Sequence, residues 1–215
     1  MKKTAYSIIL ILFVSYTTMN CGGKVKETKD AFNNLKNMAE AAETMADEME
    51  EANEELKERR ERGDTMAMHY EELAKYLPES VDDYSKSGDL DGGTTTMPGA
   101  GSFSSVSQRY ENAAGDHLEI TILDYNAAQM MFMTAMAAYA SGFSVDTPES
   151  MIKGLVVNDD VKGWQELQKK RNKAKSVVGI SKRFYVEVEA DNQSDTDFTN
   201  SIIEDEIDID ELASM

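Results

Sequence analysis

The chain has 215 residues, and its 40 acidic and 22 basic side chains give it a formal net charge of −18. Such a charge repels the phosphates of nucleic acids, and it repels anionic lipid surfaces unless a covalent anchor overrides the repulsion. The single cysteine excludes an internal disulfide and any multi-cysteine zinc or iron–sulfur site, and the two histidines exclude a three-histidine metal site.

Residues 1–20 have the pattern of an export signal. Lys2 and Lys3 precede an apolar stretch over 5–16, which is too short for a membrane-spanning helix and typical of a secretory signal. The lone Cys21 follows shortly afterwards, as in bacterial lipoproteins whose mature chain begins at a lipidated cysteine. We therefore predict a signal peptide over 1–20 and a lipid anchor of the palmitate type on Cys21, whose two acyl chains suffice for stable attachment.

The residues directly before the cysteine leave an alternative open. Thr18, Met19 and Asn20 differ from the Leu, small and Gly/Ala/Ser residues usual in a lipoprotein signal. The alternative is an uncleaved, slightly short membrane anchor with an incidental cysteine. The leading interpretation places the chain in the bacterial cell envelope, exported and anchored to a membrane, on the periplasmic side or at the cell surface.

Residues 21–63 are predicted to form an acidic helical stalk. The segment 24–62 has neither proline nor glycine and is rich in strong helix formers, and Gly63 then supplies a C-terminal stop. Spacings of four and three alternate along a heptad seam, made of Ala31, Leu35, Met38, Ala42, Met45, Met49, Ala52 and Leu56. The seam favours self-association or a protein partner over 28–59, whereas the acidic run over 40–55 favours a solvated spacer.

Residues 64–215 are predicted to form a globular α+β domain. The first expected elements are a short helix over 70–77, a strand over 81–87, a loop over 88–102, a hairpin of strands 104–111 and 117–125 around a turn at 112–116, and a buried helix over 127–139. Strands are then expected over 153–158, 163–169, 176–181 and 184–190, followed by a helix that opens with a capping box at Ser194 and Asp197 and a terminal turn over 209–213.

Strands that precede a helix twice predict an antiparallel sheet with helices packed on one face. The order also suggests a tandem β-β-β-α pseudo-repeat. The long glycine- and threonine-rich loop over 88–102 is unusual in a compact domain, so it is the expected contact for a ligand or partner, together with the open face of the sheet.

Several motifs in the chain resemble a family of uncharacterised bacterial lipoproteins. They are CGGK at the predicted mature start, the Ala/Glu/Met helix, LAKYLPES, a loop that ends in MPG, ITILDYN, VKGW, and RFYVEVEADN followed by SDTDF. The resemblance covers most of 21–215 and implies a lipidated cysteine, a stalk and an α+β domain. Because these motifs are structural landmarks, the resemblance implies no catalytic or binding residue.

Residues that could support catalysis are few. His117 has nearby serines in the sequence, namely Ser102, Ser104, Ser105 and Ser107. Without a G-x-S-x-G nucleophile elbow, we interpret His117 as a surface histidine. Gly99 and Gly101 form only a G-x-G pair, which is too little for a phosphate-binding loop. We predict no catalytic residue, no cofactor and no enzymatic activity.

Calcium is a minor alternative. Asp89, Asp91 and Gly92 match part of an EF-hand loop, but Pro98 occupies the position of the bidentate glutamate. The acidic residues over 195–211 are interpreted as a solvated helix face, with weak calcium binding as the alternative.

Copper(I) is a second minor alternative, because Met66, Met68 and His69 could supply soft ligands. The methionines of the expected buried helix are interpreted as core residues: Met130, Met131, Met133 and Met136. Trp164, the only tryptophan, is interpreted as a core or rim residue, or as part of a binding face with Tyr110, Tyr125 or Tyr185.

The leading hypothesis is a lipid-anchored, non-catalytic envelope protein with a binding or structural role. The first alternative is an oligomeric structural protein assembled through its heptad helix. The others are a weak metal-binding envelope protein and an enzyme of unknown type that joins a histidine to carboxylates. No nucleic-acid partner is expected.

Overall fold

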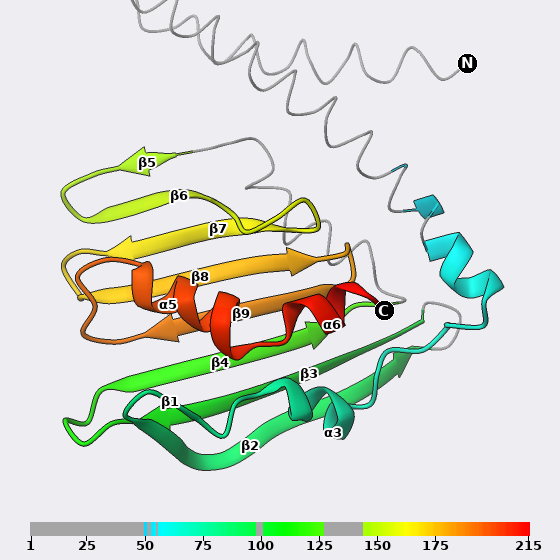
Figure 1. Ribbon diagram of the computed structural model, residues 1–215, viewed down its shortest axis with the longest axis horizontal. Coiled ribbons are helices and arrows are strands. Elements are labelled where there is room, and N and C mark those ends of the chain that lie inside the picture. Colours follow the sequence, from blue (N-terminus) through cyan, green and yellow to red (C-terminus); the bar gives the residue numbers. More distant parts are fainter. Residues whose placement is uncertain (1–49, 51–52, 55, 98–100, 127–143) are drawn as a thin grey trace, which may run out of the picture. The chain divides into compact units, whose positions relative to one another are not determined.

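The computed structural model describes residue 50 and residues 53–54, 56–97, 101–126 and 144–215 (Figure 1). The predicted signal peptide, Cys21 and most of the predicted stalk lie outside these residues, as does the helix expected over 127–139. Within the described part of the chain, no helix is both long and apolar enough to cross a membrane.

The helix before the domain ends where the sequence predicts. Residues 56–61 are helical, and Gly63 has a φ of 88°, a left-handed conformation that favours glycine. The amide of Gly63 donates to the carbonyl of Arg60 at 3.1 Å, and the amide of Asp64 donates to the carbonyl of Arg59 at 2.9 Å. These bonds satisfy carbonyls of the last helical turn, so the predicted stop at Gly63 is confirmed.

The domain is built on one antiparallel sheet of nine strands (Figure 1). In chain order they are β1 (Ser80–Val81), β2 (Tyr84–Met97), β3 (Gly101–Glu111), β4 (His117–Asp124), β5 (Val145–Asp146), β6 (Ser150–Val156), β7 (Val161–Gln168), β8 (Lys173–Ile180) and β9 (Phe184–Ala190). Their order across the sheet is β1-β2-β3-β4-β9-β8-β7-β6-β5. Two meanders therefore meet at the central pair β4–β9, and the antiparallel sheet predicted from the sequence is confirmed.

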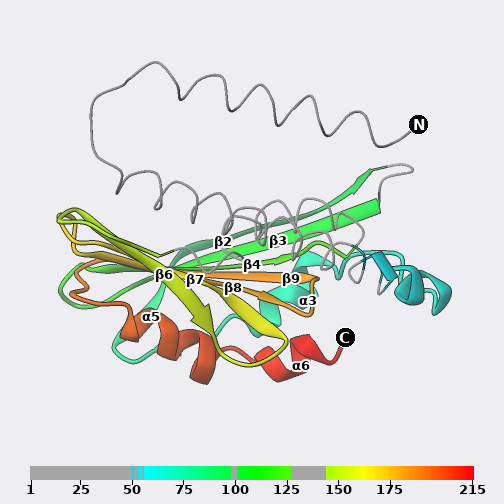
Figure 2. The ribbon, with the colours of Figure 1, turned by 90° about the horizontal axis from the view of Figure 1, so that it is seen from above.

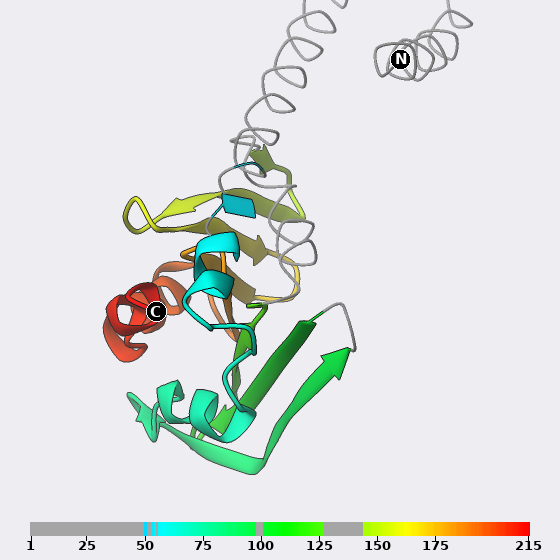
Figure 3. The same ribbon diagram turned by 90° about the vertical axis from the view of Figure 1, so that its right-hand side faces the viewer.

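Short helices cover one face of this sheet. They are α3 (Tyr70–Leu73), the 3-10 helix η1 (Ala74–Tyr76), α5 (Asp197–Ser201), the π-helix η2 (Ile202–Glu206) and α6 (Ile209–Ala213). Figures 2 and 3 show α3, α5 and α6 on the same side of the sheet. The helix expected over 70–77 is confirmed as α3 and η1, and it ends before Pro78, which cannot continue a helix.

The core lies between these helices and the sheet. Strand β4 buries Leu118, Ile120 and Ile122, and β9 buries every second residue. This is the alternation that the sequence predicts for strands with one buried face. Leu73 of α3 and Leu212 of α6 belong to the same apolar cluster, so helices from both ends of the domain close one core.

The prediction of a loop over 88–102 is wrong. Strand β2 continues to Met97 and β3 begins at Gly101, so every described residue of this segment belongs to a strand. The threonines at 94–96 pair with β3, and β-branched side chains favour this extended conformation. The glycines around them, which suggested a loop, are accommodated within β2.

One of those glycines allows a close contact inside the fold. A Cβ atom at Gly92 would lie 3.0 Å from Cδ2 of Tyr70 and 3.2 Å from Cγ1 of Val106. Glycine therefore lets α3 lie close to β2, where the amide of Tyr70 donates to Oγ1 of Thr94 at 2.9 Å. The same residue type that suggested a loop is needed here for packing in a strand.

The capping box expected at Ser194 and Asp197 does not form. The amide of Asp197 donates instead to Oδ1 of Asp195 at 3.0 Å, and the Ser194 hydroxyl donates to the same carboxylate at 3.3 Å. Asp195, and not Ser194, therefore accepts the amide of Asp197. Short polar side chains often accept nearby backbone amides near the start of a helix. The cap of the terminal turn is confirmed, because Oδ1 of Asp208 accepts the amide of Glu211 at 2.9 Å.

The opposite face of the sheet has ion pairs across β8 and β9. Nζ of Lys173 lies 2.6 Å from the carboxylate of Glu189, and Nζ of Lys175 lies 2.7 Å from Glu187 and 3.3 Å from Glu189. Burial raises the pKa of Glu189, but the hydrogen bond from Lys173 and the charge of Lys175 outweigh it, so this pKa lies below its usual value. The folded protein therefore favours the charged carboxylate.

Replacing Lys173 with methionine is expected to lower the free energy of unfolding by about 1 kcal/mol at neutral pH. Because the pKa of Glu189 is lower in the folded protein, the stabilisation is full above the usual value of 4.5 and is lost as the pH falls through the folded-state value. Urea denaturation of wild type and Lys173→Met should therefore give a difference that shrinks in acid. Lys170→Met, which removes an exposed pair with Glu149, is the control, and a difference that does not change with pH would contradict the assignment.

Candidate functional site

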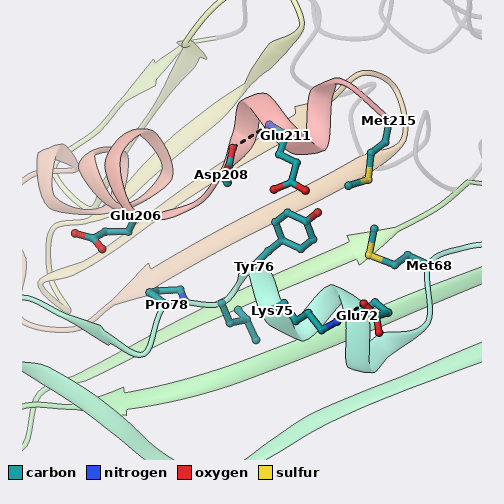
Figure 4. Close-up of a pocket in the computed structure, with 10 residues that line it drawn as sticks. Met68, Glu72, Lys75, Tyr76, Pro78, Glu206, Asp208, Glu211 and Met215 are labelled. Carbon is teal, nitrogen blue, oxygen red and sulfur yellow. Dashed lines mark hydrogen bonds and ion pairs between the residues drawn. The ribbon is translucent and has the colours of Figure 1, made fainter.

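A cleft lies between η1 and α6 (Figure 4). Its volume is about 630 Å³, which is in the range of small-molecule sites. The lining residues are Met68, Glu72, Lys75, Tyr76, Leu77, Pro78, Glu206, Asp208, Glu211 and Met215. Figure 4 shows the ring of Tyr76 directed from η1 toward α6, with the thioethers of Met68 and Met215 near one end of the cleft.

Apolar anchors and one cap fix the two walls of the cleft. Leu77 is buried at the end of η1, and Ile209 and Leu212 bury the inner side of α6. The carboxylate of Asp208 caps α6 by accepting the amide of Glu211, and this bond also holds Asp208 at the cleft. The walls come from segments that lie more than a hundred residues apart in the sequence.

The segment before α6 is a π-helix, which is a rare conformation that is frequent at functional sites. It spans Ile202–Glu206 and buries Ile202 and Ile203 in the core. Glu206, its last residue, is one of the residues that line the cleft. The π-helix therefore contributes to the core and, through its last residue, to the wall of the cleft.

The cleft is acidic. Glu72 forms an ion pair with Lys75, but Glu206, Asp208 and Glu211 have no basic partner among the described side chains. Between Arg183 and Met215 the sequence contains no lysine, arginine or histidine.

The field of these carboxylates acts on the tyrosine of the cleft. Burial is the largest cause that raises the pKa of the Tyr76 hydroxyl, and a hydrogen bond with Glu211 and the charges of Asp208 and Glu72 raise it further. The negative charge is therefore concentrated around one aromatic side chain.

A buried cluster around Arg183 ties the start of the domain to the centre of the sheet. Arg183 lies in the β8–β9 turn, and its side chain is only 6% exposed. Its Nε and Nη2 donate to the two oxygens of Asp124 at 3.1 and 2.8 Å, and its Nη1 donates to Asp64 at 3.1 Å. Asp124 is fully buried at the end of β4, so its carboxylate is desolvated. The bidentate contact with the guanidinium compensates this loss of solvation.

The same cluster holds the chain between Asp64 and α3. The amide of Met68 donates to Oδ2 of Asp124 at 2.8 Å, and Nδ2 of Asn126 donates to Oδ1 of Asp64 at 2.6 Å and to the carbonyl of Met66 at 2.8 Å. We call Asp64, Asp124, Asn126 and Arg183 the Arg183 clamp. It fixes the point at which the preceding helix joins the domain, and its charged groups face one another.

The structure does not bring together the residues that were considered for catalysis. Cys21 lies outside the described residues. His117 is exposed at the start of β4, with Nδ1 3.8 Å from the carboxylate of Glu111, and His69 is exposed at the start of α3, where Nδ1 accepts the amide of Glu71 at 3.4 Å.

The serines are divided between structural roles. Ser102 accepts the amide of Ala67 at 2.6 Å, whereas Ser107 donates to Glu119 at 3.0 Å.

The candidate metal ligands are also separated by the fold. Asp89 and Asp91 belong to strand β2, not to a loop. Met66 is half exposed, Met68 lines the cleft, and the imidazole of His69 is engaged with Glu71. In the part of the chain that the structure covers, no three histidine, cysteine or acidic side chains group in a way that could hold a metal ion.

The aromatic candidates lie on two faces. Tyr110 is fully buried under the helices, and its hydroxyl donates to the carbonyl of Pro78 at 2.7 Å. Trp164 lies on the opposite face of the sheet, where its ring meets that of Tyr185 edge-on at 6.3 Å between centroids. Trp164 is buried, as expected for a core residue, but it shares no surface with Tyr110.

Sequence reasoning missed the buried arginine at the centre of the clamp, Arg183, and the tyrosine of the cleft, Tyr76. A single arginine between two apolar strands is a weak signal for the first, and no local pattern marks the second. A scan against protein-family models and searches of curated proteins and of solved structures gave no match.

Proposed function

We propose that the protein is a lipid-anchored, non-catalytic component of a bacterial cell envelope, with a binding role for its β-sheet domain. The proposed organisation is a signal peptide over 1–20, a lipidated Cys21 at the head of an acidic helical stalk over 21–63, and a binding domain over 64–215. The sequence pattern around Cys21 and the resemblance to bacterial lipoproteins support the anchor.

The observation that carries the binding role is the acidic cleft between η1 and α6. It joins an aromatic ring and two thioethers to carboxylates without basic partners among the described residues, which is a combination suited to recognition. None of the described residues that line it is a serine, a cysteine or a histidine. We therefore assign binding to this cleft, in place of the segment 88–102.

The Arg183 clamp supports the anchored organisation. An anchored domain needs a firm connection to the segment that holds it, and Asp64 directly follows the helix stop at Gly63. Because Arg183 binds both Asp64 and Asp124, a force applied to the preceding helix would be transmitted to strand β4 in the middle of the sheet.

Metabolic labelling with a clickable palmitate analogue tests the anchor. In a bacterial host that processes lipoproteins, wild type is expected to incorporate the label and Cys21→Ser to lose essentially all of it, since the thiol is the acceptor. Ser15→Ala, a change within the signal that keeps the cysteine, should label like wild type. Equal labelling of Cys21→Ser and wild type at matched protein amounts would overturn the proposal.

A further inference from the structure

We propose that the cleft binds an organic cation, that is, an ammonium group joined to an apolar body. This inference gives a ligand class to the binding role proposed above and rests on it. It follows from the side chains that line the cleft and from the charge that the fold leaves there.

The apolar part of the ligand has a surface to contact. Met68, Tyr76 and Met215 line the cleft from different segments, and Met215 is 38% exposed. Flexible thioethers adapt to ligands of different outline, and an aromatic ring offers a flat face. The volume of about 630 Å³ exceeds what a metal ion or a simple ammonium ion would need.

The negative charge of the cleft favours a cationic ligand. Asp208, Glu211 and Glu206 are among the residues that line the cleft. Lys75, the only basic residue among the described lining residues, is already paired with Glu72. An anionic ligand would be repelled by carboxylates that have no basic partner among the described residues, whereas an ammonium group would neutralise part of this charge. The same field raises the pKa of the Tyr76 hydroxyl, after the larger effect of its burial.

Tyr76 can contact both the apolar body and the ammonium group of such a ligand. Its ring lies between the apolar end of the cleft and the carboxylates of α6 (Figure 4). A cation placed against the ring face and a carboxylate gains from both, and this is how proteins recognise substituted ammonium groups. Neither an aliphatic chain alone nor a polyamine alone would use all of these groups.

Titration of the full chain with three probes tests the proposal. Tryptamine carries an ammonium group on an indole, tryptophol has the same indole with a neutral hydroxyl, and spermine has the charge without an apolar body. With ¹³C-methyl methionine, tryptamine should shift the resonances of Met68 and Met215 saturably. Tryptophol is expected to bind about tenfold more weakly, and spermine should leave both methyl resonances in place.

Matched variants separate the cleft from general attraction to an acidic protein. Asp208→Asn with Glu211→Gln keeps the helix cap and should weaken tryptamine binding about tenfold. Asp195→Asn with Asp197→Asn removes the same charge from exposed positions outside the cleft and should leave binding unchanged. Tyr76→Leu should weaken binding with the carboxylates intact.

Equal affinities for tryptamine and tryptophol, or equal losses in the two charge variants, would overturn the ligand class. Full-length Cys21→Ser should bind tryptamine as wild type does, because the cleft lies in the domain. Failure of the anchor would thus appear in palmitate labelling alone, and failure of the ligand class would appear in the titration alone.

Discussion

Replacing Arg183 with methionine is expected to lower the free energy of unfolding by about 3–5 kcal/mol. Methionine has a comparable length, but it leaves the fully buried carboxylate of Asp124 without a countercharge. It also releases Asp64, so the segment up to Met68 loses a second attachment. Urea denaturation at neutral pH measures the global loss, and hydrogen exchange at the Met68 amide reports the local one.

Arg109 provides the control for this experiment. Its Nε lies 3.0 Å from Glu119, but the side chain of Arg109 is 74% exposed, so Arg109→Met should cost at most about 1 kcal/mol. Arg183→Lys keeps the positive charge but loses the bidentate contact with Asp124, so its loss of unfolding free energy should fall between these values. If Arg183→Met destabilised the protein no more than Arg109→Met, the clamp would not fix the start of the domain.

Replacing Gly163 with alanine is expected to destabilise the domain by about 3 kcal/mol. A Cβ atom at this position would overlap the carbonyl oxygen of Val177 and lie 2.8 Å from Cα of Val178, both in the neighbouring strand β8. Backbone atoms in a central strand cannot move aside as a flexible side chain can. Urea denaturation measures the loss, and the emission of Trp164, the next residue and the only tryptophan, should change with it.

Gly154 offers a matched control in the adjacent strand β6, where it pairs with Trp164. A Cβ atom there would have no heavy atom within 4 Å, so Gly154→Ala should change stability by no more than about 0.5 kcal/mol. Similar effects of the two substitutions would show that the close approach of β7 and β8 at Gly163 is not a constraint on the fold.

Much of the fold could be predicted from local pattern. The alternation in β4 and β9 gives the correct buried face, and Gly63 and Asp208 mark a helix end and a helix start correctly. The prediction of a loop over 88–102 was wrong, because glycines in this segment allow close packing and a bulge in β2. Both roles depend on neighbouring elements of the fold, which the local sequence does not reveal.

The candidate site could not be predicted, because it depends on contacts between distant segments. Tyr76 belongs to a short helix, and the carboxylates of Asp208 and Glu211 resemble any solvated acidic face. They form a site only because Leu73 and Leu212 enter the same core, which brings η1 and α6 together. Arg183 gains its role in the same way, from two aspartates far from it in sequence.

Mass spectrometry of the protein purified from bacterial membranes tests the proposed anchored organisation most directly. The N-terminal peptide is predicted to begin at Cys21 and to carry the mass of a diacylglyceryl group. A peptide that begins at Met1, or one that contains Cys21 without a lipid, would contradict it.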